Sequence, residues 1–143
     1  MRHVFGHWSF SGILTAQNGR HYSTLLGGDP NNDGNRFNDR ALGVGRNTNT
    51  LPALVSFDIR LGHDVPVYER AKLVLLFEAF NLFNHPNFSD INNAQFNYNN
   101  STNTFAPVTA FGTFSSTFDN PGGGGIFPGP GPRTLQLGLK FTW

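Results

Sequence analysis

Apolar residues recur at every second position in four separate segments of this chain, and that spacing constrains the fold more than any other feature. In the last segment Leu135, Leu137, Leu139 and Phe141 alternate with polar or small residues. Successive side chains of a β-strand point to opposite faces, so this pattern predicts a strand with one apolar face. No stretch repeats its apolar residues with the period of a helix. We therefore expect an all-β fold.

Three other segments show the same alternation. Trp8 to Gln17 and Val55 to Leu61 each place apolar residues mainly on one face. Lys72 to Phe83 follows the pattern too, but apolar residues such as Leu76 interrupt its polar face, so we expect it to be the most buried segment. The pattern predicts about four antiparallel strands.

The connections between these segments differ greatly in length. Asn18 to Thr50 and Asn84 to Pro132 are long and rich in Asn, Gly, Thr and Pro, whereas Gly62 to Arg70 is short and contains Pro66. Outer-membrane barrels have this asymmetry, with short periplasmic turns and long extracellular loops. The sequence therefore predicts strands of a transmembrane β-barrel with both long connections outside the cell.

The alternative is a soluble or surface-exposed β-rich ligand-binding module, because one apolar face also fits a soluble sheet packed on a core. Two features favour the membrane. Charged residues make up 13% of the chain, about half of the roughly 25% usual in soluble domains. Trp8 and Trp143 both fall at the predicted periplasmic ends, where an interfacial girdle favours aromatic rings.

Composition also argues against several functions. Ten Lys and Arg are offset by nine Asp and Glu, which leaves no concentrated basic surface for nucleic acid. The absence of Cys excludes a disulfide scaffold and a thiolate zinc site. The sequence shows neither paired carboxylates nor a catalytic triad, so we do not expect an enzyme.

Several motifs resemble one family. The run FEAFNLFNHPNF, from Phe77 to Phe88, resembles the NLFN strand end of TonB-dependent receptors. Asp29 to Asn35 (DPNNDGN), Asn38 to Arg40 (NDR), Val55 to Gly62 (VSFDIRLG) and the final LQLGLKFTW resemble, in the same order, the last strands of Oar-like TonB-dependent receptors. The resemblance implies an outer-membrane location and uptake of a bulky nutrient, such as an oligosaccharide or a peptide.

The resemblance covers nearly the whole chain but only the end of such a receptor. These receptors are described as barrels of about 22 strands with a plug in the lumen. The resemblance implies that residues 1–143 are the C-terminal part of the barrel domain, without plug, earlier strands or a signal peptide of their own, as in a gene fragment. It implies as partners the outer-membrane lipid, the barrel-assembly machinery, the rest of the barrel with its plug, and TonB only through the part that is missing.

The resemblance also points to a site at the end of the chain. Phe141 and Trp143 close an alternating last strand. In outer-membrane proteins such an aromatic end is the signal that the barrel-assembly machinery reads, and the machinery can add a strand to an exposed edge. We expect the same role here.

One loop has the spacing of a metal site. Oxygen-bearing residues recur at alternate positions around a glycine, as in loops that bind Ca²⁺: Asp29, Asn31, Asp33, Asn35 and Asp39. Asp39 falls one position short of the EF-hand pattern and no helices flank the loop, so a plain Asn/Asp/Gly turn is the alternative. Ca²⁺ is the one candidate cofactor.

No ligand-binding residues follow from the sequence. Aromatic side chains in the long connections are candidate platforms for a ligand: Tyr22, Phe37, Phe88, Phe96, Tyr98 and Phe105.

Overall fold

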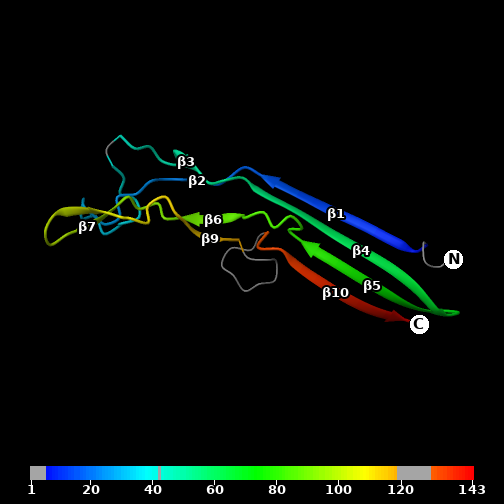
Figure 1. The fold of residues 1–143 in the computed structure, drawn as a ribbon. Coiled ribbons are helices and arrows are strands. Elements are labelled where there is room, and N and C mark those ends of the chain that lie inside the picture. Colours follow the sequence, from blue (N-terminus) through cyan, green and yellow to red (C-terminus); the bar gives the residue numbers. More distant parts are fainter. Residues whose placement is uncertain (1–5, 42, 119–129) are drawn as a thin grey trace. The chain divides into compact units, whose positions relative to one another are not determined.

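A computed structural model describes residues 6–41, 43–118 and 130–143. The fold is all-β, as the alternation predicts. Four long strands form one antiparallel sheet in the order β1-β4-β5-β10 (Figure 1): β1 (Trp8–Gln17), β4 (Leu54–Tyr68), β5 (Ala71–Phe80) and β10 (Thr134–Thr142). Neighbours in the sheet follow chain order, which makes it an up-and-down meander. Within the described ranges the sheet is open and does not close into a barrel.

The chain divides into two compact units. The sheet unit comprises Met1–Gln17, Leu54–Asn87 and Phe118–Trp143, and the loop unit comprises Asn18–Ala53 and Phe88–Thr117. The loop unit thus contains most of the two long connections. No helix in the described part of the chain is long and apolar enough to cross a bilayer.

The register brings the apolar faces of all four long strands to one side of the sheet. A representative row runs across directly paired residues from edge to edge: Phe10, Leu61, Phe77 and Leu137. The next row lies on the opposite face and is polar: Ser11, Arg60, Glu78 and Gln136. The period-two pattern of each segment therefore becomes a property of the whole sheet.

The turn between β4 and β5 is shorter than the sequence suggested. Residues Gly62 to Arg70 were expected to form it, but β4 continues to Tyr68, and only Glu69 and Arg70 lie in the turn. Pro66 was interpreted as a turn residue and lies instead inside the strand. The prediction of a turn at Gly62 was wrong.

The position of Pro66 in the ladder explains why a strand tolerates it. The Asp64 amide donates to the His7 carbonyl at 3.0 Å, the last such bond from β4 toward the β1 side. Two residues further on, Pro66 lies beyond the start of the described strand β1 at Trp8, so its missing N–H removes no bond of the described ladder. The register shifts between Pro66 and Tyr68, as at a β-bulge.

β5 also ends earlier than expected, at Phe80 rather than Phe83. Asn81 has a φ of 47° and Asn84 a φ of 53°, values in the left-handed region that Asn tolerates better than most residues. The chain therefore leaves the sheet at Asn81.

Leu76 interrupts the polar face of β5, and the neighbouring strands make room for it. It pairs with Gly62 of β4 and Gly138 of β10. A Cβ at Gly138 would lie 3.4 Å from Leu76 Cβ, and one at Gly62 would clash with Ser9 Oγ and lie 3.5 Å from Leu76 Cδ2. Two glycines thus accommodate one large residue in the middle of the sheet.

The loop unit is built from three two-stranded sheets that the sequence did not predict. These are β2 (His21–Tyr22) with β3 (Asn49–Thr50), β6 (Phe88–Ile91) with β9 (Phe114–Thr117), and β7 (Phe96–Asn99) with β8 (Thr104–Pro107). Backbone bonds join the two connections, since the Leu25 amide donates to the Asn93 carbonyl and the Gln95 amide to the Leu25 carbonyl, both at 2.9 Å. Leu51 and Ile91 are its buried apolar residues among those described.

Candidate functional site

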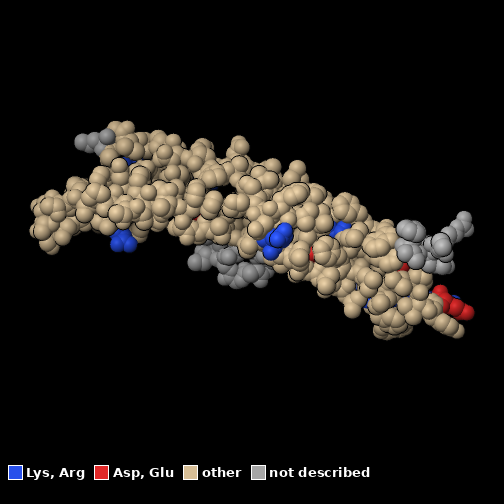
Figure 2. Space-filling view, viewed as in Figure 1, with Lys and Arg blue, Asp and Glu red and all other residues tan. Residues whose placement is uncertain are grey.

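The apolar face of the sheet unit is uncovered. Leu137, Leu139 and Leu14 expose 85%, 75% and 68% of their surface. Ala79 is the sheet unit's buried apolar residue among those described. A sheet in water would bury this face, because each Å² of apolar surface left in water forgoes about 25 cal/mol of stabilisation. The side of the molecule drawn in Figure 2 shows few charged residues. Such a face is suited to hydrocarbon.

The opposite face of the same sheet carries the charges. Arg60 Nε lies 3.4 Å from Glu78 Oε1 across directly paired positions, and Lys72 Nζ lies 2.7 Å from Asp64 Oδ2. The sheet is therefore apolar on one side and wet on the other, the arrangement of a barrel wall between lipid and lumen.

Aromatic rings cluster at the end of the sheet that holds the β4–β5 turn. Trp8 pairs with His63 and stacks on it, with ring centroids 4.2 Å apart. Phe141 and Trp143 stack at 6.0 Å and expose 52% and 90% of their surface. Both tryptophans thus lie at one end of the sheet, as predicted for an interfacial girdle.

A buried polar cluster forms where β5 leaves the sheet, at the NLFNHPN run. Asn81 exposes 1% of its surface. Its Nδ2 donates to the carbonyls of His85 (2.9 Å) and Gly131 (2.7 Å), and its Oδ1 accepts from the His85 amide (3.0 Å). The Asn81 amide donates to Asp58 Oδ1 at 2.8 Å. One side chain therefore joins the end of β5 to the segment that leads into β10.

Asn87 makes the matching connection to β4. Its Nδ2 donates to the carbonyls of Val55 and Pro130, both at 3.0 Å, and its Oδ1 accepts from the Val55 amide at 2.8 Å. We call Asn81 and Asn87 the asparagine clamp. Their side chains pair with backbone groups next to the ends of the strands, which would otherwise lack hydrogen-bond partners. The letters of this run show a family resemblance but do not predict this structural role, because the bonded carbonyls of Gly131 and Pro130 are far away in the chain.

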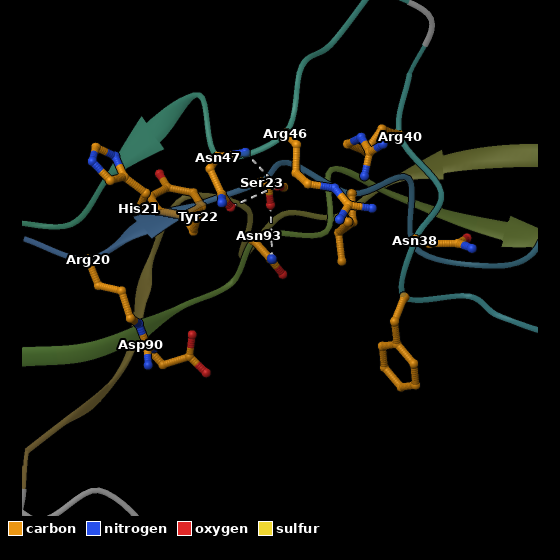
Figure 3. A pocket seen from close by; sticks show the side chains of 12 residues that line it. Arg20, His21, Tyr22, Ser23, Asn38, Arg40, Arg46, Asn47, Asp90 and Asn93 are labelled. Atoms are coloured by element: carbon orange, nitrogen blue, oxygen red, sulfur yellow. Dashed lines mark hydrogen bonds between the residues drawn. The ribbon is translucent and has the colours of Figure 1, made fainter.

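The loop unit contains a cavity of about 510 Å³ that both long connections line (Figure 3). Arg20, Arg40, Arg46 and Asp90 are its charged residues. In Figure 3 the side chains of Arg40 and Arg46 extend toward one region of the cavity. No sequence motif predicts that these charged residues line one cavity, because they are far apart in the chain.

Hydrogen bonds hold the polar wall of this cavity in place. The Asn47 amide donates to Ser23 Oγ at 2.8 Å, and Asn93 Nδ2 donates to the Ser23 carbonyl at 3.0 Å (Figure 3). Arg20 donates to the Ser89 carbonyl at 2.7 Å. The two connections thus position the lining residues from both sides.

All six aromatic residues proposed as ligand platforms belong to the loop unit. Tyr22 and Phe37 line the first cavity. Phe37 and Tyr98 line a second cavity of about 500 Å³, which shares Leu25, Phe37 and Asn93 with the first. The others pack among themselves or on neighbours, with centroid distances of 3.9 Å for Phe88 on Phe114, 6.1 Å for Phe96 with Phe105 and 4.8 Å for Tyr98 with Phe105.

A sequence comparison identifies the architecture that these surfaces suggest. The model of a family described as the outer membrane beta barrel domain matches residues 41–136, about two thirds of the chain. The chain belongs to this outer membrane beta barrel domain family. A search of curated proteins and a search of solved structures returned no match.

Membership of the outer membrane beta barrel domain family places the chain in the cell outer membrane. The match includes all of β4 and β5, so it covers the centre of the amphipathic sheet. The predicted localisation and the predicted fold class are confirmed, and the soluble alternative is set aside. The uncovered apolar face is therefore the face that meets lipid.

In this outer membrane beta barrel domain, the 29–39 loop is a chain of side-chain-to-backbone turns. Asp29 accepts from the amides of Asp33 (3.0 Å) and Gly34 (2.8 Å), and Asp33 accepts from the Asn35 amide (2.8 Å). Asp39 exposes 8% of its surface, and its Oδ2 has no hydrogen-bond partner within the described chain. No group of three or more His, Cys, Asp or Glu side chains that could hold a metal is found in residues 6–41, 43–118 and 130–143. Calcium binding at Asp29, Asn31, Asp33, Asn35 and Asp39 stays a prediction.

The carboxylates of this loop differ in their titration. Hydrogen bonds from the Asn35 amide and the Asn38 side chain hold the pKa of Asp33 below its ordinary value. Burial, followed by repulsion from Asp33 and Asp29, raises the pKa of Asp39. Asp33 is thus stabilised in its charged form and Asp39 is not.

Proposed function

We propose that this chain forms part of the wall of a larger outer-membrane barrel, of the TonB-dependent receptor type, that takes up a bulky nutrient. The observation that carries the proposal is the sheet itself, with leucines exposed on one face and ion pairs on the other. The motif resemblance to Oar-like receptors supports this receptor type over other outer-membrane barrels. The role proposed is transport, and we assign no catalytic activity.

The edges of the sheet support a larger barrel. β1 and β10 each pair with one long strand in the described sheet, so the backbone N–H and C=O groups along their outer sides meet no further strand among the described residues. In hydrocarbon every such unsatisfied group costs several kcal/mol. Further strands of the same barrel are the partners that remove this cost, which agrees with the prediction that residues 1–143 are the C-terminal part of a barrel domain.

The proposal assigns distinct partners to the two ends of the sheet. Phe141 and Trp143 are exposed at the turn end, where the barrel-assembly machinery binds them. The machinery pairs with β10, which is an edge strand of the described sheet. The loop unit follows from the opposite strand ends and is expected on the extracellular side, where it contacts the nutrient. Energy is relayed by TonB through a plug, elements that the receptor type places outside these strands.

Crosslinking in cells tests the barrel wall. A photoreactive amino acid at Ser11, on edge strand β1, is expected to crosslink to another β-strand of an outer-membrane barrel, in a fraction that only detergent extracts. The same group at Phe105, in the loop unit, serves as the matched control and is expected to give no such adduct. Release of the chain by salt alone, or the same adducts from both positions, would contradict the proposal.

Uptake measurements test the transport role. Cells with and without the gene are supplied with labelled oligosaccharides and peptides, with and without a protonophore. We expect accumulation of one class to fall both when the gene is deleted and when the proton gradient is collapsed. Accumulation that is unaffected by the deletion for every compound would refute transport while leaving the membrane location intact.

A further inference from the structure

The charges of the loop unit are unevenly distributed. Its ranges contain four Arg and four Asp. Three of these Arg line the first cavity, with Asp90 as the only Asp among its described lining residues. Asp29 and Asp33 instead accept amide hydrogen bonds within their own loop. The cavity therefore has an excess of positive charge that the composition of the unit does not show.

Two of the cavity arginines lack a protein anion. Arg40 and Arg46 form no salt bridge within 4.0 Å in the described part of the chain. Figure 3 shows their side chains extending toward the same region of the cavity. Two guanidinium groups directed into one space favour an anionic ligand group, since Arg binds carboxylates through a planar, two-pronged donor set.

The cavity also has polar, uncharged side chains in its lining, among them those of Ser23, Asn47 and Asn93. The hydrogen bonds that join these three residues use Asn47 Oδ1 and Asn93 Nδ2. Asn47 Nδ2 and Asn93 Oδ1 can therefore bond to ligand hydroxyls, one as a donor and the other as an acceptor. These features favour a ligand that carries hydroxyls as well as a negative charge.

Size and shape extend the argument to a ligand of several rings. The two cavities, of about 510 and 500 Å³, meet at Leu25, Phe37 and Asn93. Phe37 exposes 71% of its surface, and the Arg36 guanidinium lies 5.0 Å from its ring centroid. Tyr98 lines the second cavity. Aromatic side chains next to arginine and amide groups suit sugar rings, which have apolar faces and hydroxyl edges.

We propose that the loop unit binds a carboxylated saccharide, with an acidic group at Arg40 and Arg46, hydroxyls at Asn47 and Asn93, and further sugar rings reaching the second cavity. This rests on the proposed function, which exposes the loop unit to nutrients outside the cell. It deepens that function by naming the substrate class.

Binding to the full chain, extracted in detergent from outer membranes, tests the proposal. The probe is tetragalacturonate, and its fully methyl-esterified form is the matched neutral control. We expect tetragalacturonate to bind at least about 10-fold more tightly than the ester, the effect of losing one charge-assisted contact. The preference should shrink at high salt, because screening weakens the ionic contact. Equal binding of acid and ester, or tighter binding of tetraglutamate, would overturn the proposal in favour of a neutral sugar or an acidic peptide.

Variants connect the binding to the named residues. Arg40→Gln with Arg46→Gln should weaken tetragalacturonate binding about 100-fold and leave the ester unaffected. Arg46→Lys should lose about 10-fold or less because it keeps the charge, and Arg70→Gln, in the β4–β5 turn, should change nothing. Detergent-only extraction of each variant shows that the barrel is intact. An intact wild-type chain without binding would refute this inference alone, whereas a chain released by salt would refute the proposed function.

Discussion

The sheet unit and the loop unit achieve stability in opposite ways. The sheet unit presents its large apolar side chains outward, with Leu137 and Leu139 exposing 85% and 75% of their surface. Among its described residues, the loop unit buries Leu51 and Ile91 and packs aromatic rings such as Phe88 on Phe114. Hydrogen bonds between polar side chains and the backbone, such as those of Asp29, hold its turns. Contact with lipid stabilises the sheet unit, and hydrogen bonds within local turns stabilise the loop unit.

This difference shows which environment each unit requires. The apolar face of the sheet gains its stabilisation only when hydrocarbon replaces water. Hydrogen-bonded Asx turns are stable in water and need no apolar partner. Substitutions that change polarity should therefore act strongly on the sheet and weakly on the loops, whereas substitutions that remove a hydrogen bond should act on both.

Removing the aromatic end is expected to have the largest effect. Deleting Phe141 to Trp143 should abolish insertion, because the assembly machinery then lacks the aromatic strand end that we propose it reads. Heat-modifiable mobility on gels measures folded barrel. A deletion of the same length in the β7–β8 turn, residues 100–102, should leave that mobility normal. If the variant without Phe141 to Trp143 migrates normally, these residues are not the assembly signal.

A charge on the lipid face is expected to act next most strongly. Leu137→Arg should cost about 2–4 kcal/mol if Leu137 lies near the bilayer midplane. Gln136→Arg, one residue away on the polar face and paired with Glu78, should cost little. Unfolding by urea in lipid vesicles compares the two variants. Equal costs would show that the two faces do not meet different environments, contrary to the barrel-wall interpretation.

The asparagine clamp should contribute several kcal/mol. Asn81→Ala removes three side-chain hydrogen bonds and leaves buried backbone groups unpaired, at roughly 1–3 kcal/mol each. Asn84→Ala is the matched control, because Asn84 shares the left-handed φ but is exposed and accepts one bond, from the Arg133 amide. The Asn81 variant should therefore unfold at clearly lower urea. Similar midpoints would mean that backbone conformation, and not the clamp, determines the cost.

The sheet could be predicted from the sequence because its determinants are local. Alternation fixes which residues share a face, and it excludes register slips of one residue, which would take Phe10, Leu61, Phe77 and Leu137 off their common side. It does not distinguish registers that differ by two residues, so the exact pairing comes from the structure. Strand ends were less predictable. Pro66 indicated a turn because the sequence cannot show that it lies beyond the described pairing of β4 with β1.

The loop unit could not be predicted for the opposite reason. Its strands have two to four residues, too short for a periodic pattern. Its connections are long-range, as between Leu25 and Ala94. The cavity arginines come from separate parts of one connection and share the cavity lining with Asp90 from the other. Asn-rich composition indicated turns correctly, but it carried no information about which turns meet.

The smallest expected effects come from two carboxylates of the 29–39 loop, and they have opposite signs. In chelator at neutral pH, Asp33→Asn should weaken the loop unit, because it removes the charged acceptor that the Asn35 amide binds. Asp39→Asn should strengthen it, because a charge that is buried and repelled by Asp33 and Asp29 disappears. Hydrogen exchange of loop-unit amides measures both changes.

Acidification separates these two effects further. The folded pKa of Asp39 lies above its ordinary 3.8, so its ionisation lowers stability at neutral pH, and this loss is relieved as the pH falls through the folded pKa. The benefit of Asp39→Asn should therefore fade as the pH falls from the folded pKa toward 3.8, and it should disappear below 3.8. Asp33 has a lowered pKa, so its ionised form adds stability above its unfolded pKa, and this stability is lost only as the pH falls through the lower folded value.

Added Ca²⁺ distinguishes a calcium loop from a plain turn. A calcium loop requires the negative charge of Asp39, whereas the same charge destabilises the loop unit when a chelator has removed Ca²⁺. The calcium hypothesis predicts that Ca²⁺, and not Mg²⁺, protects wild-type amides and that Asp39→Asn abolishes this protection, whereas equal protection in both ions would leave the segment a plain Asn/Asp/Gly turn.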